Sequence, residues 1–236
     1  MDWYIIIVII ITSIIQSFFG VGVLLFGTPL LLLLGYPFFE SLLIVLPVSA
    51  SINLGQILKD YRHIDFKFYK NILLFSIPFI ILCLFLVDKV LLNVSIYIGL
   101  FLIFIALKEH IKLFKDIMNK ILSYNKIFYI IIGVVHGITN LGGALLTARV
   151  FHANLNKFQK RATIAISYMT FAIFQIITVL FLDYDFGNSN FIYIIIGLFV
   201  YITVNRFLFH RITDLKYDKL FSVFLIITGL LLIFNR

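Results

Sequence analysis

The residues best suited to chemistry lie in Gly133–Val150, which reads GVVHGITNLGGALLTARV inside an otherwise apolar chain. This stretch combines four glycines with His136, Thr139 and Asn140. Glycines let a backbone turn and let a ligand approach closely, while hydroxyl and amide groups offer hydrogen bonds. A helix that restarts after such a turn presents free N–H groups and the positive end of its dipole. This chemistry suits the binding of an anion.

Polar side chains also recur at helical spacing in two other apolar segments. Ser49, Asn53 and Gln56 share one helix face in the segment LPVSASINLGQIL. Tyr168 and Gln175 form the corresponding face in the second half of the chain. Amides in hydrocarbon need partners, so these faces either line a cavity, which we favour, or form hydrogen bonds between helices.

Two residues and the glycines of the first stretch keep alternative roles. His136 is the only histidine deep within an apolar segment. A structural hydrogen bond is the commoner role for such a residue, and proton coupling is the alternative. Arg149 either extends to the membrane interface or draws anions inward. Gly142 and Gly143 of this stretch, like Gly20, Gly22 and Gly27 in the first half of the chain, serve either packing or backbone bending, or direct contact with a ligand.

Residues that the apolar segments lack also narrow the function. All eleven acidic residues fall in loops or at segment ends. A cation transporter or a carboxylate-based proton pump normally keeps an acidic residue within the membrane, so an anionic substrate is favoured. The segments hold no paired carboxylates, no cluster with metal-ligand spacing and no serine nucleophile motif. We therefore expect no enzyme activity, no metal and no other cofactor.

Membrane helices must position these residues. Of the 236 residues 62% are hydrophobic and 13% are charged, and the mean hydropathy is +1.11. In soluble domains about half of the residues are hydrophobic and about a quarter are charged. The chain is therefore a membrane protein.

The net charge of +8 reflects basic loops of a polytopic membrane protein and not a nucleic-acid partner. The single cysteine, Cys83, excludes disulfides. The apolar blocks run roughly over 3–34, 41–58, 68–87, 90–107, 126–150, 162–182, 190–205 and 219–235.

The two halves of the chain resemble each other. The segment GVLLFGTPLLL (22–32) matches GITNLGGALLT (137–147) at an offset of 115 residues, whereas Gln56 matches Gln175 at an offset of 119. A four-residue insertion in the second copy reconciles the two offsets. We expect one transmembrane domain over 1–236, with repeat 1 at about 1–107, an amphipathic surface linker at 108–125 and repeat 2 at about 126–236.

The basic residues decide how the blocks cross the membrane. If all eight cross once, the two sides hold nine and ten of the 19 Lys and Arg residues, although cytoplasmic loops normally hold a clear excess. If blocks 3–34 and 126–150 are hairpins that enter and leave the membrane on the same side, 17 of the Lys and Arg residues fall on one side of the membrane and two on the other. As one helix, block 3–34 would measure about 48 Å against a hydrocarbon core of about 30 Å. Long tilted spans remain the alternative.

The hairpin topology predicts an all-α polytopic membrane protein. It consists of two inverted repeats, each a re-entrant broken-helix hairpin plus three transmembrane helices. We expect the breaks at Gly20–Gly22 and at Thr139–Gly143. Irregular backbone at membrane depth is tolerated where protein buries it or where it lines a wet cavity. Transporters built from inverted repeats bind substrate at such breaks.

The segments FFGVGVLLFGTPLLLLLGYP (18–37) and GVVHGITNLGGALLTARVF (133–151) resemble those that open each half of the sulfite exporter TauE/SafE family of membrane transporters. Segment 46–58 resembles the small-residue helix that follows. The resemblance implies transport of small sulfur-containing anions such as sulfite, sulfoacetate and other organosulfonates. The chain departs from the family pattern in Gly-Val-Gly-Val, where glycine runs are frequent, and in Ala144, where proline is common.

Together these observations predict a secondary transporter that moves such an anion by alternating access. A passive anion channel or a structural membrane subunit is the alternative, and a membrane-embedded enzyme is less favoured. The expected partners are the anion and the lipid bilayer, and the expected location is the bacterial or archaeal plasma membrane, multi-pass, with both termini outside. The residues expected to bind the anion near the midplane are Gly20, Val21, Gly22, Val23, Asn53, Gln56, Thr139, Asn140, Leu141, Gly142, Gly143 and Gln175.

The hairpin topology can be tested by cysteine labelling. Single cysteines at Asn119 and Asn156 should both react with a membrane-impermeant thiol reagent from the cytoplasmic side, because both loops are cytoplasmic in this topology. Eight single crossings would place the two positions on opposite faces. Labelling of the two cysteines from different sides would therefore contradict the hairpins.

Overall fold

The computed structural model describes residues 2–19, 21–90, 94–107, 111, 113, 116, 125–153, 155–187 and 190–207. Within these ranges every regular element is helical, which confirms the expected all-α membrane protein. Among the described residues, three helices are long and apolar enough to cross a membrane, namely Phe38–His63, Phe66–Val90 and Phe158–Phe181. Gly20, most of the predicted surface linker and the block predicted at 219–235 lie outside the described residues.

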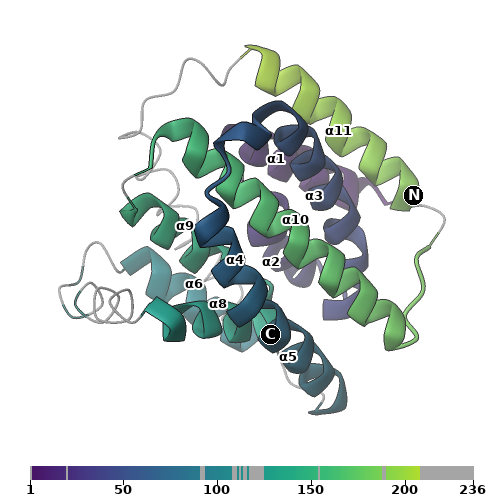
Figure 1. The fold of residues 1–236 in the computed structure, drawn as a ribbon. Helices are drawn as coiled ribbons and strands as arrows, with labels where there is room; N and C mark the ends of the chain where they lie inside the picture. Colours follow the sequence, from purple (N-terminus) through teal and green to yellow (C-terminus); the bar gives the residue numbers. More distant parts are fainter. Residues whose placement is uncertain are drawn as a thin grey trace.

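The helices follow the predicted blocks closely. The first half contains α1 (Trp3–Phe19), the π-helical turn η1 (Val23–Gly27), α2 (Thr28–Leu33), α3 (Phe38–Asp60), η2 (Tyr61–His63), α4 (Phe66–Phe75), α5 (Ile77–Val90) and α6 (Val94–Leu107). The second half contains α8 (Asn125–Thr139), α9 (Gly142–His152), α10 (Lys157–Phe181) and α11 (Asn190–Phe207). In Figure 1, α3 and α10 lie at the centre, between α11 and the α4–α5 pair.

The outer helices expose apolar side chains at helical spacing. On α11 the side chains of Ile195, Phe199 and Ile202 are mostly exposed, and on α1 those of Ile7 and Ile11 are exposed as well. Apolar stripes of this extent are unusual on soluble proteins. They fit contact with the lipid of a membrane.

The α1 and η1–α2 segments form a hairpin that returns to its starting end. The Tyr36 hydroxyl, just after α2, donates a hydrogen bond to the Asp2 carboxylate, just before α1. This bond holds the pKa of Asp2 below its ordinary value and raises the pKa of Tyr36 to about 12. Gly22 lies against α1, because a Cβ there would sit 2.4 Å from the Gln16 nitrogen and 2.5 Å from the Thr12 oxygen. The chain therefore folds back on itself as expected.

The α8 and α9 helices form a second hairpin of the same design. The Arg149 guanidinium, near the end of α9, lies 5.9 Å from the ring centroid of Phe128, near the start of α8. A Cβ at Gly142 would sit 2.5 Å from the Ile132 oxygen and 2.8 Å from the His136 nitrogen. In both hairpins the glycine after the break meets the residues six and ten positions before it.

This geometry corrects the alignment of the two halves. Gly22 corresponds to Gly142 and not to Gly137, so the hairpins are related by nearly the same offset as Gln56 and Gln175. No four-residue insertion is needed. Gly137 packs against α5 instead, where a Cβ would lie 2.6 Å from the Cβ of Cys83. The sequence match at 115 residues was wrong because Gly and Leu recur by chance in such a composition.

The central helices α3 and α10 pack against each other in antiparallel fashion. Asp60, the last residue of α3, forms a buried ion pair with Arg161 in the second turn of α10. The Arg161 Nε–H donates to Asp60 Oδ2 at 2.9 Å. Nearby, the Asp65 backbone N–H donates to Thr163 Oγ1 at 2.9 Å. We call the end of the molecule formed by residues 59–70 and 149–163 the basic end.

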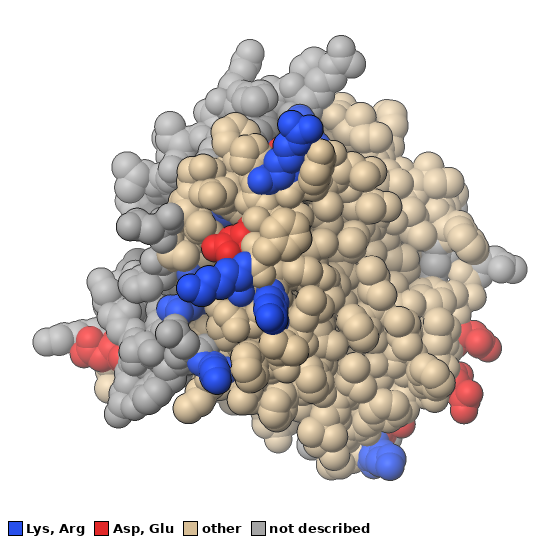
Figure 2. All heavy atoms as spheres, viewed as in Figure 1, with Lys and Arg blue, Asp and Glu red and all other residues tan. Residues whose placement is uncertain are grey.

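Other contacts close the opposite end of α3 and α10. The Tyr184 ring stacks on Phe39 with 4.5 Å between centroids, and its hydroxyl donates to Asp88 Oδ1 at 3.0 Å. We call this end, formed by residues 36–40, 88–89 and 183–187, the acidic end. Figure 2 shows basic side chains mainly over α4 and the end of α3, at the basic end, and acidic side chains where α10 ends.

These contacts favour the hairpin topology. They place the loops at 59–67 and 149–161 at the same end of the molecule, whereas eight single crossings would separate them by a bilayer. The first hairpin opens toward the acidic end and the second toward the basic end. The inverted relation of the two complete halves stays a prediction, because block 219–235 lies outside the described residues.

Each half supplies a helix to the other half. Helix α11 packs on α1 and α3, while α5 packs on α8 and α10. Glycines permit the close approach: a Cβ at Gly197 of α11 would lie 2.5 Å from Val48, and one at Gly133 of α8 would lie 2.4 Å from the Ser76 oxygen. Each hairpin is therefore covered partly by the other half of the chain.

Cross-linking can test the placement of the loops. The rings of His63 and Phe158 lie 5.5 Å apart at the basic end. Cysteines at these two positions, in a Cys83→Ala background, should join readily through a short bifunctional thiol reagent in native membranes. The pair His63 and Tyr184, at opposite ends, is the control and should not join. Absence of the first cross-link, with both thiols reactive, would contradict the hairpin topology.

Candidate functional site

Polar side chains meet at the first break, and Gln16 organises them. Its carboxamide oxygen accepts a hydrogen bond from the N–H of Val23, the first residue of η1, at 2.9 Å. Its nitrogen donates to Asn53 Oδ1 at 3.0 Å and lies 3.4 Å from Ser49 Oγ. The Gln56 nitrogen donates to the backbone oxygen of Gln16 at 3.2 Å. Gln16 therefore caps the second arm of the hairpin and attaches it to α3.

This first cluster satisfies nearly all of its own hydrogen bonds. The Asn53 nitrogen donates to Ser49 Oγ at 3.3 Å, so both polar atoms of Gln16 and of Asn53 have partners. Within the cluster only Gln56 Oε1 has none. Gln16 is not among the residues expected from the sequence to form the site. Its signal in the sequence is that it is the only amide in the first apolar block.

The second break is formed by Asn140 and Leu141. Asn140 adopts the left-handed conformation, with φ of 61°, which ends α8 and turns the chain. The Leu141 N–H donates to Thr139 Oγ1 at 3.1 Å, and that hydroxyl donates to the Val135 oxygen at 2.6 Å. Asn140 Nδ2 donates to Thr28 Oγ1 at 2.7 Å, so the two hairpins are joined directly. The other amide atom, Asn140 Oδ1, has no partner.

A buried pair of side chains lies beside the second break. His136 Nε2 and Gln175 Oε1 are 3.1 Å apart, and both side chains are fully buried. The imidazole packs on Phe171 with 4.5 Å between ring centroids. Neither His136 Nδ1 nor Gln175 Nε2 has a partner. Buried polar atoms without partners are rare in native structures, so this pair stands out chemically.

The glycines after the second break are closely packed against neighbouring residues. A Cβ at Gly143 would lie 1.4 Å from the Tyr168 hydroxyl oxygen and 2.0 Å from its Cζ. Any side chain at Gly143 must therefore displace a buried aromatic ring. Close packing, one of the two roles considered for these glycines, is what the geometry shows. A substitution there tests the packing before it tests a ligand contact.

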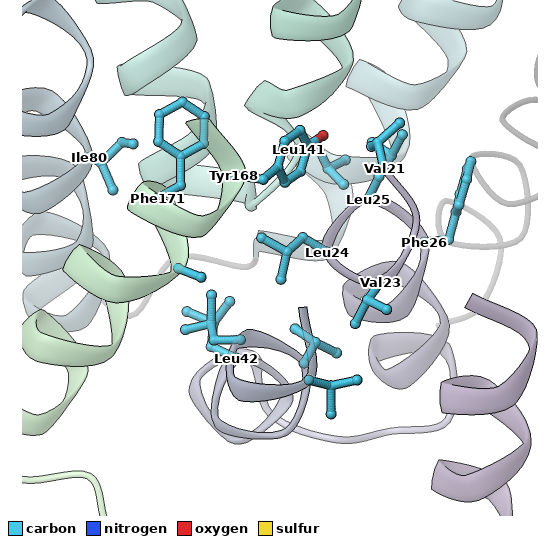
Figure 3. Close-up of a cluster of buried hydrophobic side chains, with 14 of the residues drawn as sticks. Val21, Val23, Leu24, Leu25, Phe26, Leu42, Ile80, Leu141, Tyr168 and Phe171 are labelled. Atoms are coloured by element: carbon cyan, nitrogen blue, oxygen red, sulfur yellow. The ribbon is translucent and has the colours of Figure 1, made fainter. Parts of the chain in front are cut away.

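The remaining predicted site residues lie near the same centre. Val21, Val23 and Leu141 are fully buried and belong to the apolar core. Figure 3 shows Leu141 and Tyr168 beside the turn that carries Val21 and Leu25. The Thr139 hydroxyl is used within its own hairpin. The backbone of the two breaks is therefore surrounded by a mixture of apolar and neutral polar side chains.

The centre carries no fixed charge among the residues described. Among the described residues, the buried Asp, Glu, Lys and Arg side chains are those of Asp60 and Arg161, which pair with each other at the basic end. The described residues contain no group of three or more His, Cys, Asp or Glu side chains able to hold a metal ion. The arrangement offers neutral donors and acceptors, which suit a ligand that must bind and leave again.

Comparison with known families decides the class of protein. A sequence model of the family "Sulfite exporter TauE/SafE" matches residues 5–232, nearly the whole chain. The chain belongs to this family. No curated protein and no solved structure matches it. As a TauE/SafE protein it is an integral membrane protein of a transporter family, and membership implies a membrane exporter of sulfite or related sulfur compounds.

The packing of Gly143 predicts a specific coupling. Gly143→Ala should lower the free energy of unfolding by about 2 kcal/mol, because the new methyl group overlaps the Tyr168 ring. In a Tyr168→Ala background the same change should cost much less. Thermal unfolding in detergent of the native protein, the two single variants and the double variant measures this coupling. Ile173→Ala, an exposed position on α10, is the matched control and should combine additively with Gly143→Ala. Additivity with Tyr168→Ala would contradict the contact.

Proposed function

We propose that this TauE/SafE protein is a secondary transporter that moves a small sulfur-containing anion across the plasma membrane by alternating access. Sulfite, sulfoacetate and other organosulfonates are the substrate class. The observation that carries this proposal is the buried polar centre at two helix breaks, held between α3 and α10 in a chain of this family.

The chemistry of the centre supports an anion. An anion gives up strong hydration on entering hydrocarbon, and aligned N–H groups and helix dipoles can offset this cost. The chain breaks at Val21–Val23, where Gln16 already accepts the Val23 N–H, and at Leu141–Gly143, where the start of α9 presents its N–H groups beside Gln175. A buried Lys or Arg would bind the anion more tightly but would slow its release. The uncharged centre therefore favours turnover.

The closed state of the centre favours a carrier over a channel. Asn53, Gln56, His136 and Gln175 have no solvent exposure. Contacts between helices are formed at both the basic end and the acidic end. A carrier passes through such a state and opens one end at a time, whereas a conducting channel is open at both. We place the opening of the basic end at the interface between α3 and α10.

Transport in proteoliposomes tests the proposal. The purified protein should take up radiolabelled sulfite, thiosulfate or sulfoacetate with saturation, and unlabelled substrate inside the vesicles should accelerate uptake. Taurine and acetate probe the selectivity for charge and for the sulfur head group. Non-saturating flux without counterflow would instead indicate an anion channel. Transport of cations alone would overturn the proposed substrate class.

The ion pair at the basic end should control access to the centre. Asp60→Asn leaves Arg161 with a neutral partner and should favour separation of α3 and α10 at this end. A cysteine at the buried Ala165 of α10, in a Cys83→Ala background, should then react several-fold faster with an impermeant reagent from the cytoplasmic side.

The matched control lies at the acidic end of the molecule. Asp88→Asn weakens the contact with Tyr184 and should leave the cytoplasmic labelling of Ala165→Cys unchanged. Equal labelling rates in the Asp60→Asn variant and in the native protein would contradict a role for the ion pair in opening. Thermal unfolding, measured in parallel, shows whether faster labelling reflects opening or general loss of structure.

A further inference from the structure

We propose that the anion binds at the second hairpin break alone, in a subsite formed by His136, Gln175 and the first turn of α9. The first break is its structural counterpart and holds no ligand. This inference rests on the proposed transport function and specifies where in the centre the substrate is held.

The two breaks share one backbone design. Gly22 and Gly142 each lie on the first arm of their own hairpin, against the residue six positions earlier. That residue is Gln16 in the first hairpin and His136 in the second. A glutamine of the following long helix contacts each of them: Gln56 bonds the backbone of Gln16, and Gln175 bonds the imidazole of His136. The breaks therefore differ mainly in side-chain chemistry.

At the first break the place of a ligand is already taken. The Gln16 oxygen accepts the N–H of Val23 at 2.9 Å, which is the bond that an anion would form there. The Gln16 nitrogen is held by Asn53 at 3.0 Å. An anion would have to displace a side chain that is fixed at both of its polar atoms. The first break is thus closed by the protein itself.

At the second break the equivalent side chain cannot form such a cap. His136 points its Nε2 at Gln175, and no side chain of the N-cap residue Leu141 caps α9. The N–H groups of Gly142 and Gly143 open this eleven-residue helix, where no intrahelical acceptor exists. A Cβ at Gly142 would lie 2.5 Å from the Cβ of His136, so His136 adjoins the start of the helix.

The His136–Gln175 pair also keeps an unused donor whichever way its amide is oriented. With Gln175 Oε1 toward the ring, the amide nitrogen is free to donate. With the amide reversed, its nitrogen donates to His136 Nε2 and the imidazole Nδ1–H becomes free. In both cases a fully buried N–H group lacks a partner. Buried donors without a partner are rare in native structures, so this donor points to a ligand.

The donors around this break match a small oxyanion. The Tyr168 ring lies against Gly143, and its centroid is 6.3 Å from that of the His136 ring, so the amide–imidazole pair and the helix N–H groups adjoin one region. No carboxylate among the described buried residues lies at the centre to repel an anion. A sulfite ion or a sulfonate group presents three oxygens, enough to accept from several of these donors at once.

Equilibrium binding of sulfite to the purified full-length protein tests the subsite. Gln175→Ala should weaken the sulfite Kd about tenfold, as expected for one hydrogen bond to a charged group. Ser49→Ala removes a hydrogen-bond acceptor of Gln16 and Asn53 at the first break, so it should lower the unfolding temperature and leave the Kd within about twofold of the native value. Unfolding temperatures measured for each variant separate loss of binding from loss of fold.

The sharpest variant is His136→Gln. It places at the second break the side chain that caps the first, so the new amide should occupy the start of α9. Sulfite binding should fall at least tenfold while the unfolding temperature stays native or rises. A native Kd in a folded His136→Gln protein, or an equal loss in Ser49→Ala and Gln175→Ala, would overturn the subsite alone. A native protein that binds neither sulfite, thiosulfate nor sulfoacetate would overturn the proposed substrate class first.

Discussion

Breaking a helix inside a membrane leaves backbone N–H and C=O groups without partners, in surroundings that supply no water. Gly22 and Gly142 reduce that cost, because each lets the second arm of its hairpin lie directly on the backbone of the first. Side-chain oxygens of Gln16 and Thr139 accept N–H groups at the two breaks. The long helices are arranged around these breaks, since α3 packs on η1 and α10 packs on α9.

The closed centre depends equally on contacts at its two ends. At the basic end Asp60 and Arg161 form a buried ion pair, and at the acidic end Tyr184 joins Phe39 and Asp88. A buried ion pair stabilises a fold little compared with apolar packing of the same volume. Its position between the two central helices therefore fits a contact that forms and breaks during the proposed transport cycle.

The two hairpins show how one backbone design can carry two chemistries. In the first, Gln16 satisfies the break and fastens it to α3. In the second, His136 occupies the same position but leaves a donor unused beside the start of α9. A single side-chain difference thus separates a rigid break from one that we propose to bind substrate. Glycines serve packing in both.

The amino-acid sequence alone determined the membrane class and the approximate bounds of the helices in the described ranges, and it predicted the hairpin topology that the contacts of the structure favour. These properties follow from the length of apolar runs and the distribution of charge, which can be summed along the chain. It also marked Asn53, Gln175 and the glycines near the breaks. Only the tertiary structure decided that Gln16 joins Asn53, that Gly22 corresponds to Gly142, and that Gly143 packs on Tyr168. Such contacts depend on how distant helices pack against one another, and a composition dominated by Ile, Leu and Phe allows many registers.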